Sequence, residues 1–291
     1  MTREEFSALT RNGPVLLDGA TGSNLMRVGM PRGVCAEEWI LAHPEKLTAL
    51  QAAYAAAGSQ IVYAPTFGAN RYNLSRYNLQ ENVRAWNSAL VALSRSISGV
   101  LVAGDVTTTG VALEPNGPMT YNELHDIYAE QIGALIDAGV DLLVIETMLG
   151  VNETVTALEA ARGLCDLPVL CSMTVQADGS CYFGGDCLEA VETLQALGAD
   201  AVGINCSCGP EQLVSLVRNM KKIAAVPLLV KPNAGMPTIS DSGEAVYPMM
   251  PTEFARQMRR LVQEGASLVG GCCGTTPEFI AALRGVISAP H

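Results

Sequence analysis

Three cysteines in two short motifs have the residue type and the positions needed to hold a metal ion. Cys272 and Cys273 are adjacent in the glycine-rich stretch 270–277, directly after the apolar run 266–269, and Cys206 follows the apolar run 201–205. Three thiolates without an obvious fourth protein ligand are typical of catalytic zinc, whereas structural zinc is usually closed by four protein ligands. We therefore expect Zn²⁺ at these cysteines, with an open coordination position for the sulfur of a thiol substrate.

The elements that must position these cysteines alternate regularly along the chain. Apolar runs, expected to be strands buried on both faces, occupy 15–17, 60–64, 100–104, 141–145, 168–173, 201–205, 227–230 and 266–269. Helices are predicted over 44–57, 74–98, 121–138, 152–165, 187–197, 210–224, 252–264 and from Pro277 onward. Strands alternating with helices predict a parallel sheet.

Eight such units predict the α/β class and a single (β/α)8 TIM barrel. We expect one barrel domain over residues 1–291, with 233–250 as a long loop after the seventh strand. An open, doubly wound parallel sheet is the alternative.

Other polar residues follow predicted strands and would share the rim of the barrel with the cysteines. In such barrels the active site lies at the C-terminal ends of the strands. Asp18 follows the first strand, Glu146 the fourth and Asn233 the seventh. Each has a purely structural alternative: Asp18 could order the turn 19–22, Glu146 could begin a helix, and Asn233 could be a turn residue.

The remaining six cysteines have different expected roles. Nine cysteines in a chain of this size indicate ligands, nucleophiles or core residues rather than disulfides if the compartment is reducing. For Cys35 the sequence favours no role, and Cys208 competes with Cys206 because a Cys-X-Cys pair can chelate a metal. A disulfide between Cys272 and Cys273, or a phosphate-binding loop at 270–276, are further alternatives. Four cysteines are expected to be small buried apolar residues: Cys165, Cys171, Cys181 and Cys187.

Composition excludes several classes of function. Lys+Arg 18 against Asp+Glu 29 gives a net charge of -11, which argues against a nucleic-acid partner. No apolar run reaches the roughly 18 residues of a membrane span, and the first residues lack the apolar core of a signal peptide. We therefore expect a cytoplasmic protein. The three histidines share no common location, so a histidine-based site has little support.

With these motifs the chain resembles the zinc-dependent homocysteine S-methyltransferases. The spacing is closest to the homocysteine-binding barrel of cobalamin-dependent methionine synthase. The motifs run from the first predicted strand to the last: Asp18-Gly19-Ala20-Thr21-Gly22, Glu146-Thr147, Gly203-Ile204-Asn205-Cys206, Pro232-Asn233-Ala234-Gly235 and the double-cysteine stretch 270–277.

The resemblance implies a role for each matching position. Zinc would be held by Cys206, Cys272 and Cys273, and Asn233 would fill the open zinc position before the substrate arrives. Zinc deprotonates a coordinating thiol, which otherwise has a pKa near 8.5, and the thiolate is the nucleophile.

The amino-acid end of homocysteine would bind on the other side of the site. The resemblance implies that Glu146 binds the substrate ammonium, and that backbone amides around Asp18, Gly19 and Ala20 bind its carboxylate. The implied reaction is methyl transfer to the homocysteine thiol, giving methionine.

The methyl donor is the part of the reaction for which several alternatives stay open. We expect a methyl-corrinoid protein that carries methylcobalamin and acts in trans. S-methylmethionine, S-adenosylmethionine or betaine are alternative donors, and a different thiol is an alternative acceptor. A non-catalytic barrel that binds zinc or a protein partner is the alternative of another class.

Two motifs differ from the pattern of the family. After the second strand the family often has Thr-Asn-Thr-Phe, where this chain has Ala64-Pro65-Thr66-Phe67. After the third it often has Gly-Pro-Thr-Gly, where this chain has Thr107-Thr108-Thr109-Gly110. Both differences fall at the barrel mouth, where thiol and donor must sit, and leave the zinc motifs unchanged.

Overall fold

A ring of parallel strands forms the centre of the molecule in the computed structural model, which describes residues 1–239 and 245–287. The 8-stranded sheet has the order β1-β10-β7-β6-β5-β4-β3-β2. A parallel bridge between Leu17 and Ile61 joins β1 to β2 and closes the ring, so the predicted (β/α)8 barrel is confirmed. The strands are β1 (Val15–Leu16), β2 (Ile61–Tyr63), β3 (Leu101–Thr107), β4 (Leu142–Met148), β5 (Val169–Met173), β6 (Ala201–Asn205), β7 (Leu228–Lys231) and β10 (Ala266–Val269).

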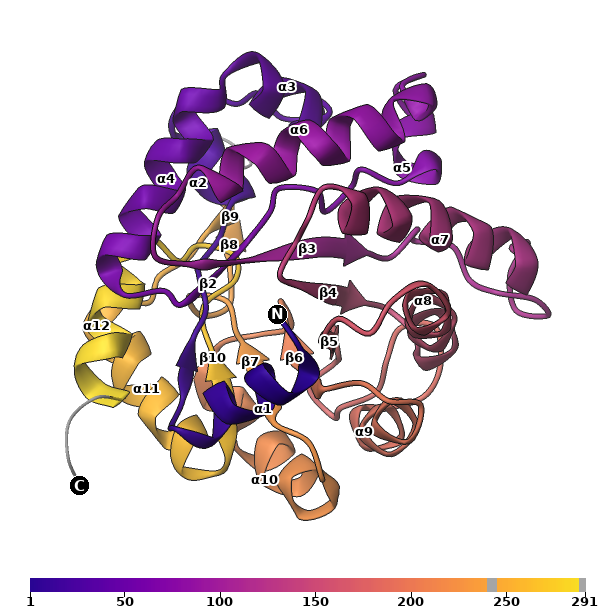
Figure 1. Ribbon diagram of the computed structural model, residues 1–291. Helices are drawn as coiled ribbons and strands as arrows, with labels where there is room; N and C mark the ends of the chain where they lie inside the picture. The colour runs from indigo at the N-terminus through magenta and orange to yellow at the C-terminus, as the bar shows by residue number, and fades with distance from the viewer. Residues whose placement is uncertain (240–244, 288–291) are drawn as a thin grey trace.

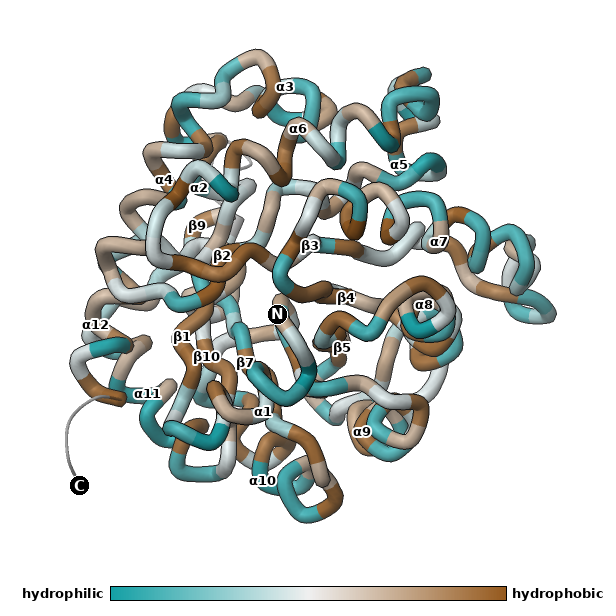
Figure 2. The backbone as a smooth tube through the Cα atoms, in the orientation of Figure 1, coloured by the Kyte–Doolittle hydropathy of each residue, from teal (hydrophilic) through white to brown (hydrophobic). Residues whose placement is uncertain are grey.

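Helices surround the ring (Figure 1), and apolar segments are visible along strands such as β1 and β2 (Figure 2). Helix α4 shows how the sequence sets their limits, because it begins at Pro44 and ends before Gly58, which has a φ of 113°. The outer helices are α4 (Pro44–Ala57), α6 (Val83–Arg95), α7 (Tyr121–Asp137), α8 (Val151–Leu164), α9 (Cys187–Ala196), α10 (Val214–Ile223), α11 (Pro251–Gln263) and α12 (Pro277–Ile287).

Helix α1 (Arg3–Arg11) lies across one end of the barrel (Figure 1). Its start is fixed by a capping box in which Thr2 and Glu5 bond each other's backbone amides. Its buried side chain, Phe6, packs into the same apolar cluster as Leu17 and Ile61. The helix therefore closes the barrel core at the N-terminal ends of the strands.

One expectation about the connections was wrong, and one was incomplete. The predicted helix 74–98 is instead α5 (Arg71–Ser75), the 3₁₀ turn η1 (Gln80–Asn82) and α6. The chain turns at Asn78, which has a φ of 60°, a conformation that asparagine tolerates better than most residues. The predicted loop 233–250 contains a hairpin of β8 (Thr238–Ile239) and β9 (Ala245–Val246), while 240–244 lie outside the described residues.

Four helical elements were not predicted as such. They are α1, α2 (Gly22–Arg27), α3 (Ala36–Ala42) and the 3₁₀ turn η2 (Pro210–Leu213), which precedes α10. Among the described helices, none combines the length and the apolar composition that crossing a membrane requires.

Inside the barrel, an apolar layer lies below a polar one. Side chains alternate between the two faces of a strand with period two. Ile61, Ala103, Val144, Leu170 and Leu229 belong to one buried apolar cluster. Two positions closer to the C-terminal end of each of these strands, the inward side chain is polar and buried: Tyr63, Asp105, Glu146, Ser172 and Lys231. The polar layer forms the floor of the site.

Candidate functional site

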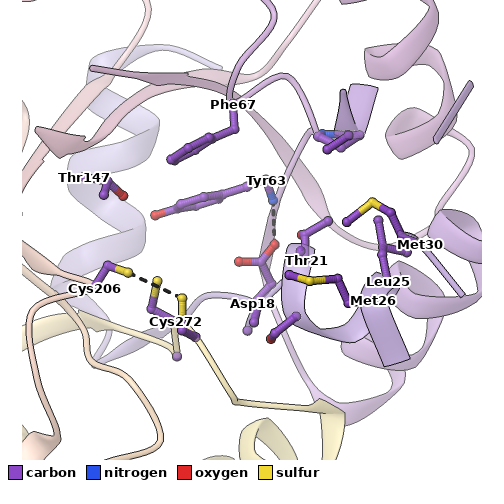
Figure 3. A pocket seen from close by; sticks show the side chains of 18 of the residues that line it. Asp18, Thr21, Leu25, Met26, Met30, Tyr63, Phe67, Thr147, Cys206 and Cys272 are labelled. Carbon is purple, nitrogen blue, oxygen red and sulfur yellow. Dashed lines mark hydrogen bonds between the residues drawn. The ribbon is translucent and has the colours of Figure 1, made fainter. Parts of the chain in front are cut away.

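The side chains of Cys206, Cys272 and Cys273 meet where β6 and β10 end. Figure 3 shows Cys206 and Cys272 pointing toward one another. The three Sγ atoms lie within 4.8 Å of one another, and those of Cys206 and Cys273 are 3.5 Å apart. A tetrahedral ion with bonds of about 2.3 Å would hold its sulfur ligands about 3.8 Å apart. The donor set and its spacing therefore fit zinc.

The protonation of these thiols also suits a metal. Hydrogen bonds with Cys206 and Cys272 lower the pKa of Cys273 to about 3. Hydrogen bonds with Cys206 and Cys273 raise the pKa of Cys272 well above its usual value. Because a thiolate is the form that binds a metal, the lowered pKa of Cys273 favours metal binding at this cluster.

The other cysteines lie apart from this cluster. Within residues 1–239 and 245–287, the group of close sulfurs includes Cys206 and not Cys208. The buried Cys208 belongs to the main apolar core. No disulfide joins Cys272 to Cys273. Cys35 is buried, and its Sγ lies 3.3 Å from Oε2 of Glu37. Of the four cysteines expected in the core, Cys165 is partly buried, and the other three are buried: Cys171, Cys181 and Cys187.

Backbone hydrogen bonds hold Asn233 beside the double cysteine. Cys272 N donates to Pro232 O at 2.8 Å, and Ala234 N donates to Cys273 O at 2.9 Å. The Oδ1 of Asn233 is buried without a hydrogen-bond partner among the described residues. Because an unsatisfied buried acceptor costs about 1–3 kcal/mol, this oxygen is suited to a ligand at the cluster.

Cys206 itself sits in a strained backbone. Its φ is 51°, in the left-handed region, which costs a non-glycine residue about 1–3 kcal/mol. Its N donates to Lys231 O at 3.1 Å, so the strand register holds the residue in this conformation. Such strain is concentrated at functional sites.

A cavity of about 830 Å³ opens beside the three sulfurs. Asp18, Tyr63, Asp105, Glu146 and Lys231 also line it. In Figure 3 the hydroxyl of Tyr63 points toward the side of the cavity where Thr147 and Cys206 lie. The volume is in the range of small-molecule sites, and the cavity presents sulfur on one side and charged groups on the other.

Glu146 is an inward-facing residue within β4. The interpretation of this residue as a helix N-terminal carboxylate is wrong, since α8 begins at Val151. Burial raises the pKa of Glu146 to about 7, although the ammonium of Lys231 opposes the rise. Asn205 Nδ2 donates to Glu146 Oε2 at 3.2 Å, and Asn205 Oδ1 accepts from Ser172 Oγ at 2.9 Å. These bonds fix the orientation of the carboxyl.

Asp18 joins three strands of the barrel instead of ordering the turn that follows it. Its Oδ2 accepts from Tyr63 N at 2.8 Å, and its Oδ1 accepts from Lys231 Nζ at 2.8 Å. The Nζ of Lys231 also lies 3.6 Å from the centre of the Tyr63 ring. Burial alone would lower the pKa of Lys231, but the groups around it, Asp18 first among them and then Tyr63 and Glu146, together raise that pKa. The lysine is therefore charged.

The turn after Asp18 brings backbone amides to the cavity. A Cβ at Gly19 would lie 2.6 Å from the hydroxyl oxygen of Tyr54, so only glycine fits there. Ala20 N donates to Thr275 Oγ1 at 3.1 Å. Of these two amides, that of Gly19 is therefore the better placed to meet a ligand.

The chain matches the homocysteine S-methyltransferase family over residues 15–287. It belongs to that family. Methionine synthases of Mycobacterium leprae (strain TN) and Mycobacterium tuberculosis (strain ATCC 25618 / H37Rv) are each 30% identical over 290 residues, covering 93% of this chain and 24% of the relative. The chain thus spans about a quarter of the length of these curated relatives.

Solved structures of a family member have the same fold. The metallated form of the homocysteine methyltransferase MmuM from Escherichia coli has a TM-score of 0.80 at 23% identity, covering 96% of this chain and 98% of that one. Its oxidized form has a TM-score of 0.78 at 25% identity, covering 94% and 95%.

Several residues that line this candidate site were not predicted. Lys231, Tyr63 and Asp105 were counted as strand residues or passed over, and Asn205 only as part of a motif. Each lies two positions after an inward-facing residue of the barrel. The alternation of side chains along a strand could have identified them, but this requires the ends of each strand to be known to within one residue.

The two motifs that differ from the family pattern have mainly structural contacts. Thr66 Oγ1 donates to Asp105 O at 2.8 Å. Thr109 donates from both N and Oγ1 to Glu153 Oε1, at 2.8 and 2.9 Å. Pro65 and Phe67 line the cavity, and Phe67 is exposed, so these two residues of the motifs can meet a donor.

Proposed function

We propose that this protein transfers a methyl group to the thiol of homocysteine and so forms methionine, with zinc as its metal. The observation that carries the proposal is the placement of three sulfurs within 4.8 Å on one wall of a cavity whose floor holds Glu146, Asp18 and Lys231. A thiol and an amino-acid end, the two parts of homocysteine, complement these two walls. Membership of the family supports the same reaction.

The three cysteines would bind the zinc ion, and Asn233 Oδ1 would take its fourth position before the substrate binds. When bound, zinc lowers the pKa of a coordinating thiol, so that a thiolate is available at neutral pH. The three protein sulfurs are anionic ligands, and their charge would keep the substrate sulfur rich in electrons.

The other residues would bind and orient the substrate. Glu146, oriented by Asn205, would accept hydrogen bonds from the substrate ammonium. The Gly19 amide would donate to its carboxylate, beside the Asp18–Lys231 ion pair. Fixing both ends of a short substrate sets the direction in which its sulfur faces the donor, and such positioning supplies much of the acceleration in bimolecular reactions.

We propose a methyl-corrinoid protein, acting in trans, as the donor. Large apolar side chains that are exposed in the described part of the chain gather in the loops at the C-terminal ends of the strands, among them Phe67, Tyr77, Tyr182, Phe183, Met236 and Met250. Exposed apolar patches around a site mark surfaces for partners. A small donor would need only the cavity.

A donor panel tests the proposal. The zinc-loaded protein is incubated with homocysteine and, separately, with methylcobalamin bound to a corrinoid protein, free methylcobalamin, S-methylmethionine, S-adenosylmethionine and betaine, and methionine is measured by mass spectrometry. Methionine formed from the corrinoid protein alone supports the full proposal. Methionine formed only from a small donor would correct the donor and keep the reaction.

Two results would point elsewhere. Methylation of another thiol in preference to homocysteine would keep the metal chemistry and change the acceptor. No methylated thiol from any donor, in a folded protein with one zinc per chain, would support a non-catalytic barrel that binds zinc or a protein.

A further inference from the structure

Asp105 is a buried carboxylic acid at the floor of the cavity, and its role is not explained by the interactions described above. Only 5% of its surface is exposed, and its side chain lines the cavity. On β3 it lies two residues before Thr107, which pairs with Glu146 on β4. The alternation of side chains therefore places Asp105 and Glu146 on the inner face of neighbouring strands.

The carboxyl of Asp105 lacks the partners that its neighbours have. Its Oδ1 has no hydrogen-bond partner within residues 1–239 and 245–287. By contrast, Asp18 accepts from Lys231 and Tyr63, and Glu146 accepts from Asn205. Burying a carboxylate without partners is costly, and burial together with the charge of Glu146 raises the pKa of Asp105 well above its usual value.

The backbone of Asp105 is, in contrast, fully engaged. Its N donates to Thr66 Oγ1 at 3.0 Å, and its O accepts from that hydroxyl at 2.8 Å. Gln131 Nε2 lies a further 3.5 Å from the same carbonyl oxygen. These bonds hold the backbone of the residue in place, so its side chain stays on the inner face of the barrel. An unpartnered acceptor held in this way is suited to a ligand.

The charges around Asp105 define that ligand. The acidic groups that raise its pKa are Glu146, Asp18 and Glu37, and Lys231, the cation that opposes this rise, is already paired with Asp18. The group that is missing is a cation with several N–H donors. A primary ammonium has three and can serve two carboxylates at once, whereas a sulfonium or a quaternary ammonium has none.

We propose that Asp105 binds the substrate ammonium together with Glu146, one from each of two adjacent strands. This inference rests on the proposed function and adds a second carboxylate to the subsite. It makes the free amino group a requirement of the acceptor: thiols that lack an amine, or carry it acylated, leave two buried carboxylates unpaired. Acceptor choice is thereby set by the floor of the cavity as well as by the metal.

Binding of two thiols to the wild type and to Asp105→Asn tests this contact. The thiols are homocysteine and 4-mercaptobutanoate, which has no amino group, and binding to the zinc-loaded protein is measured by calorimetry. In Asp105→Asn we expect homocysteine to bind about 10- to 100-fold more weakly, the range for a hydrogen bond to a charged group. Binding of 4-mercaptobutanoate should change less than about 3-fold. Asp126→Asn, an exposed change on α7, is the control and should affect neither.

The outcomes separate this inference from the function it rests on. If the wild type binds both thiols equally well, thiol binding stands and the ammonium role is overturned. Equal losses for both thiols in Asp105→Asn would show a structural role only, and no loss would also overturn the proposal. If the wild type binds neither thiol, the proposed function fails and this inference fails with it.

A second variant covers the case in which Asp105→Asn does not fold. In Glu146→Gln, Asp105 remains as the one carboxylate of the pair. We expect this variant to keep a preference for homocysteine over 4-mercaptobutanoate of at least about 10-fold. A complete loss of preference would show that Glu146 alone recognises the ammonium.

Discussion

Cys206 and Cys208 are two positions apart, yet only Cys206 joins the sulfur cluster of the described chain. The difference arises in the backbone, because the left-handed conformation at residue 206 directs that side chain to the cavity. Cys208 packs in the apolar core. A pair of cysteines that the sequence presents as equivalent therefore has one metal-binding candidate.

Replacing each cysteine in turn tests this assignment. Cys206→Ser should weaken zinc binding by more than about 100-fold, because even residues behind the ligands of metal sites contribute 10- to 100-fold. Cys208→Ser should keep one zinc per chain. Metal content after dialysis, measured by mass spectrometry, distinguishes the two. Zinc retained in Cys206→Ser and lost from Cys208→Ser would transfer the role.

Glu146 should make the stability of the metal-free protein depend on pH. Its pKa rises from 4.5 to about 7 on folding, so the folded state holds a proton that the unfolded state releases between these values. The free energy of unfolding should therefore fall as the pH rises from 4.5 to 7 and then level off. Glu146→Gln has no carboxyl group to titrate, so its free energy of unfolding should not fall in this way. The difference in free energy of unfolding between the variant and the wild type should therefore be about 3 kcal/mol larger above pH 7 than at pH 4.5.

Urea unfolding of both proteins in the presence of a chelator, at pH 5, 6, 7 and 8, measures this difference. Groups that titrate alike in both proteins cancel when the two free energies of unfolding are subtracted. A difference that stays constant across this range would mean that Glu146 does not change its protonation on folding.

At the scale of elements, eight strands and most helices were predictable because their signals are local. A Pro at the start and a Gly at the end delimit α4, and apolar runs mark the strands. The break between α5 and α6 was not predictable, since asparagine is only a moderately weak helix former and whether the chain turns at Asn78 depends on packing. Asp105 was missed for a similar reason, because its inward direction depends on the sheet register.

Helix α1 offers a prediction about an element far from the site. Phe6 is 1% exposed and fills the N-terminal end of the barrel core. Phe6→Ala should lower the free energy of unfolding by about 3–5 kcal/mol, as for other buried aromatic residues, and leave zinc content unchanged. Thermal unfolding with metal analysis measures both, and Thr10→Ala on the same helix is the control. Loss of zinc from the folded variant would show that this end of the barrel is coupled to the site.

At the scale of the whole molecule, the two ends of the barrel differ in surface as well as in chemistry. Most of the exposed large apolar side chains in the described part of the chain belong to segments that follow the C-terminal ends of the strands, among them Phe67 at the cavity, whereas Leu164 and Leu197 lie at the C-terminal ends of α8 and α9, where the chain returns to the strands. The mouth is therefore the face that we expect a donor protein to cover. The sequence could not show this, because the rim is assembled from loops separated by many residues.

Charged substitutions on the two faces separate docking from chemistry. Met236→Glu combined with Met250→Glu should lower kcat/KM with a methyl-corrinoid protein by about 10-fold, since side chains at the centre of an interface carry most of its binding energy. Leu164→Glu combined with Leu197→Glu adds the same charge at the other end and should have no effect. Calorimetry should show unchanged homocysteine binding in both. If free methylcobalamin loses activity to the same extent as the protein donor, the methionines serve the cavity; if neither donor is affected, the donor protein docks elsewhere.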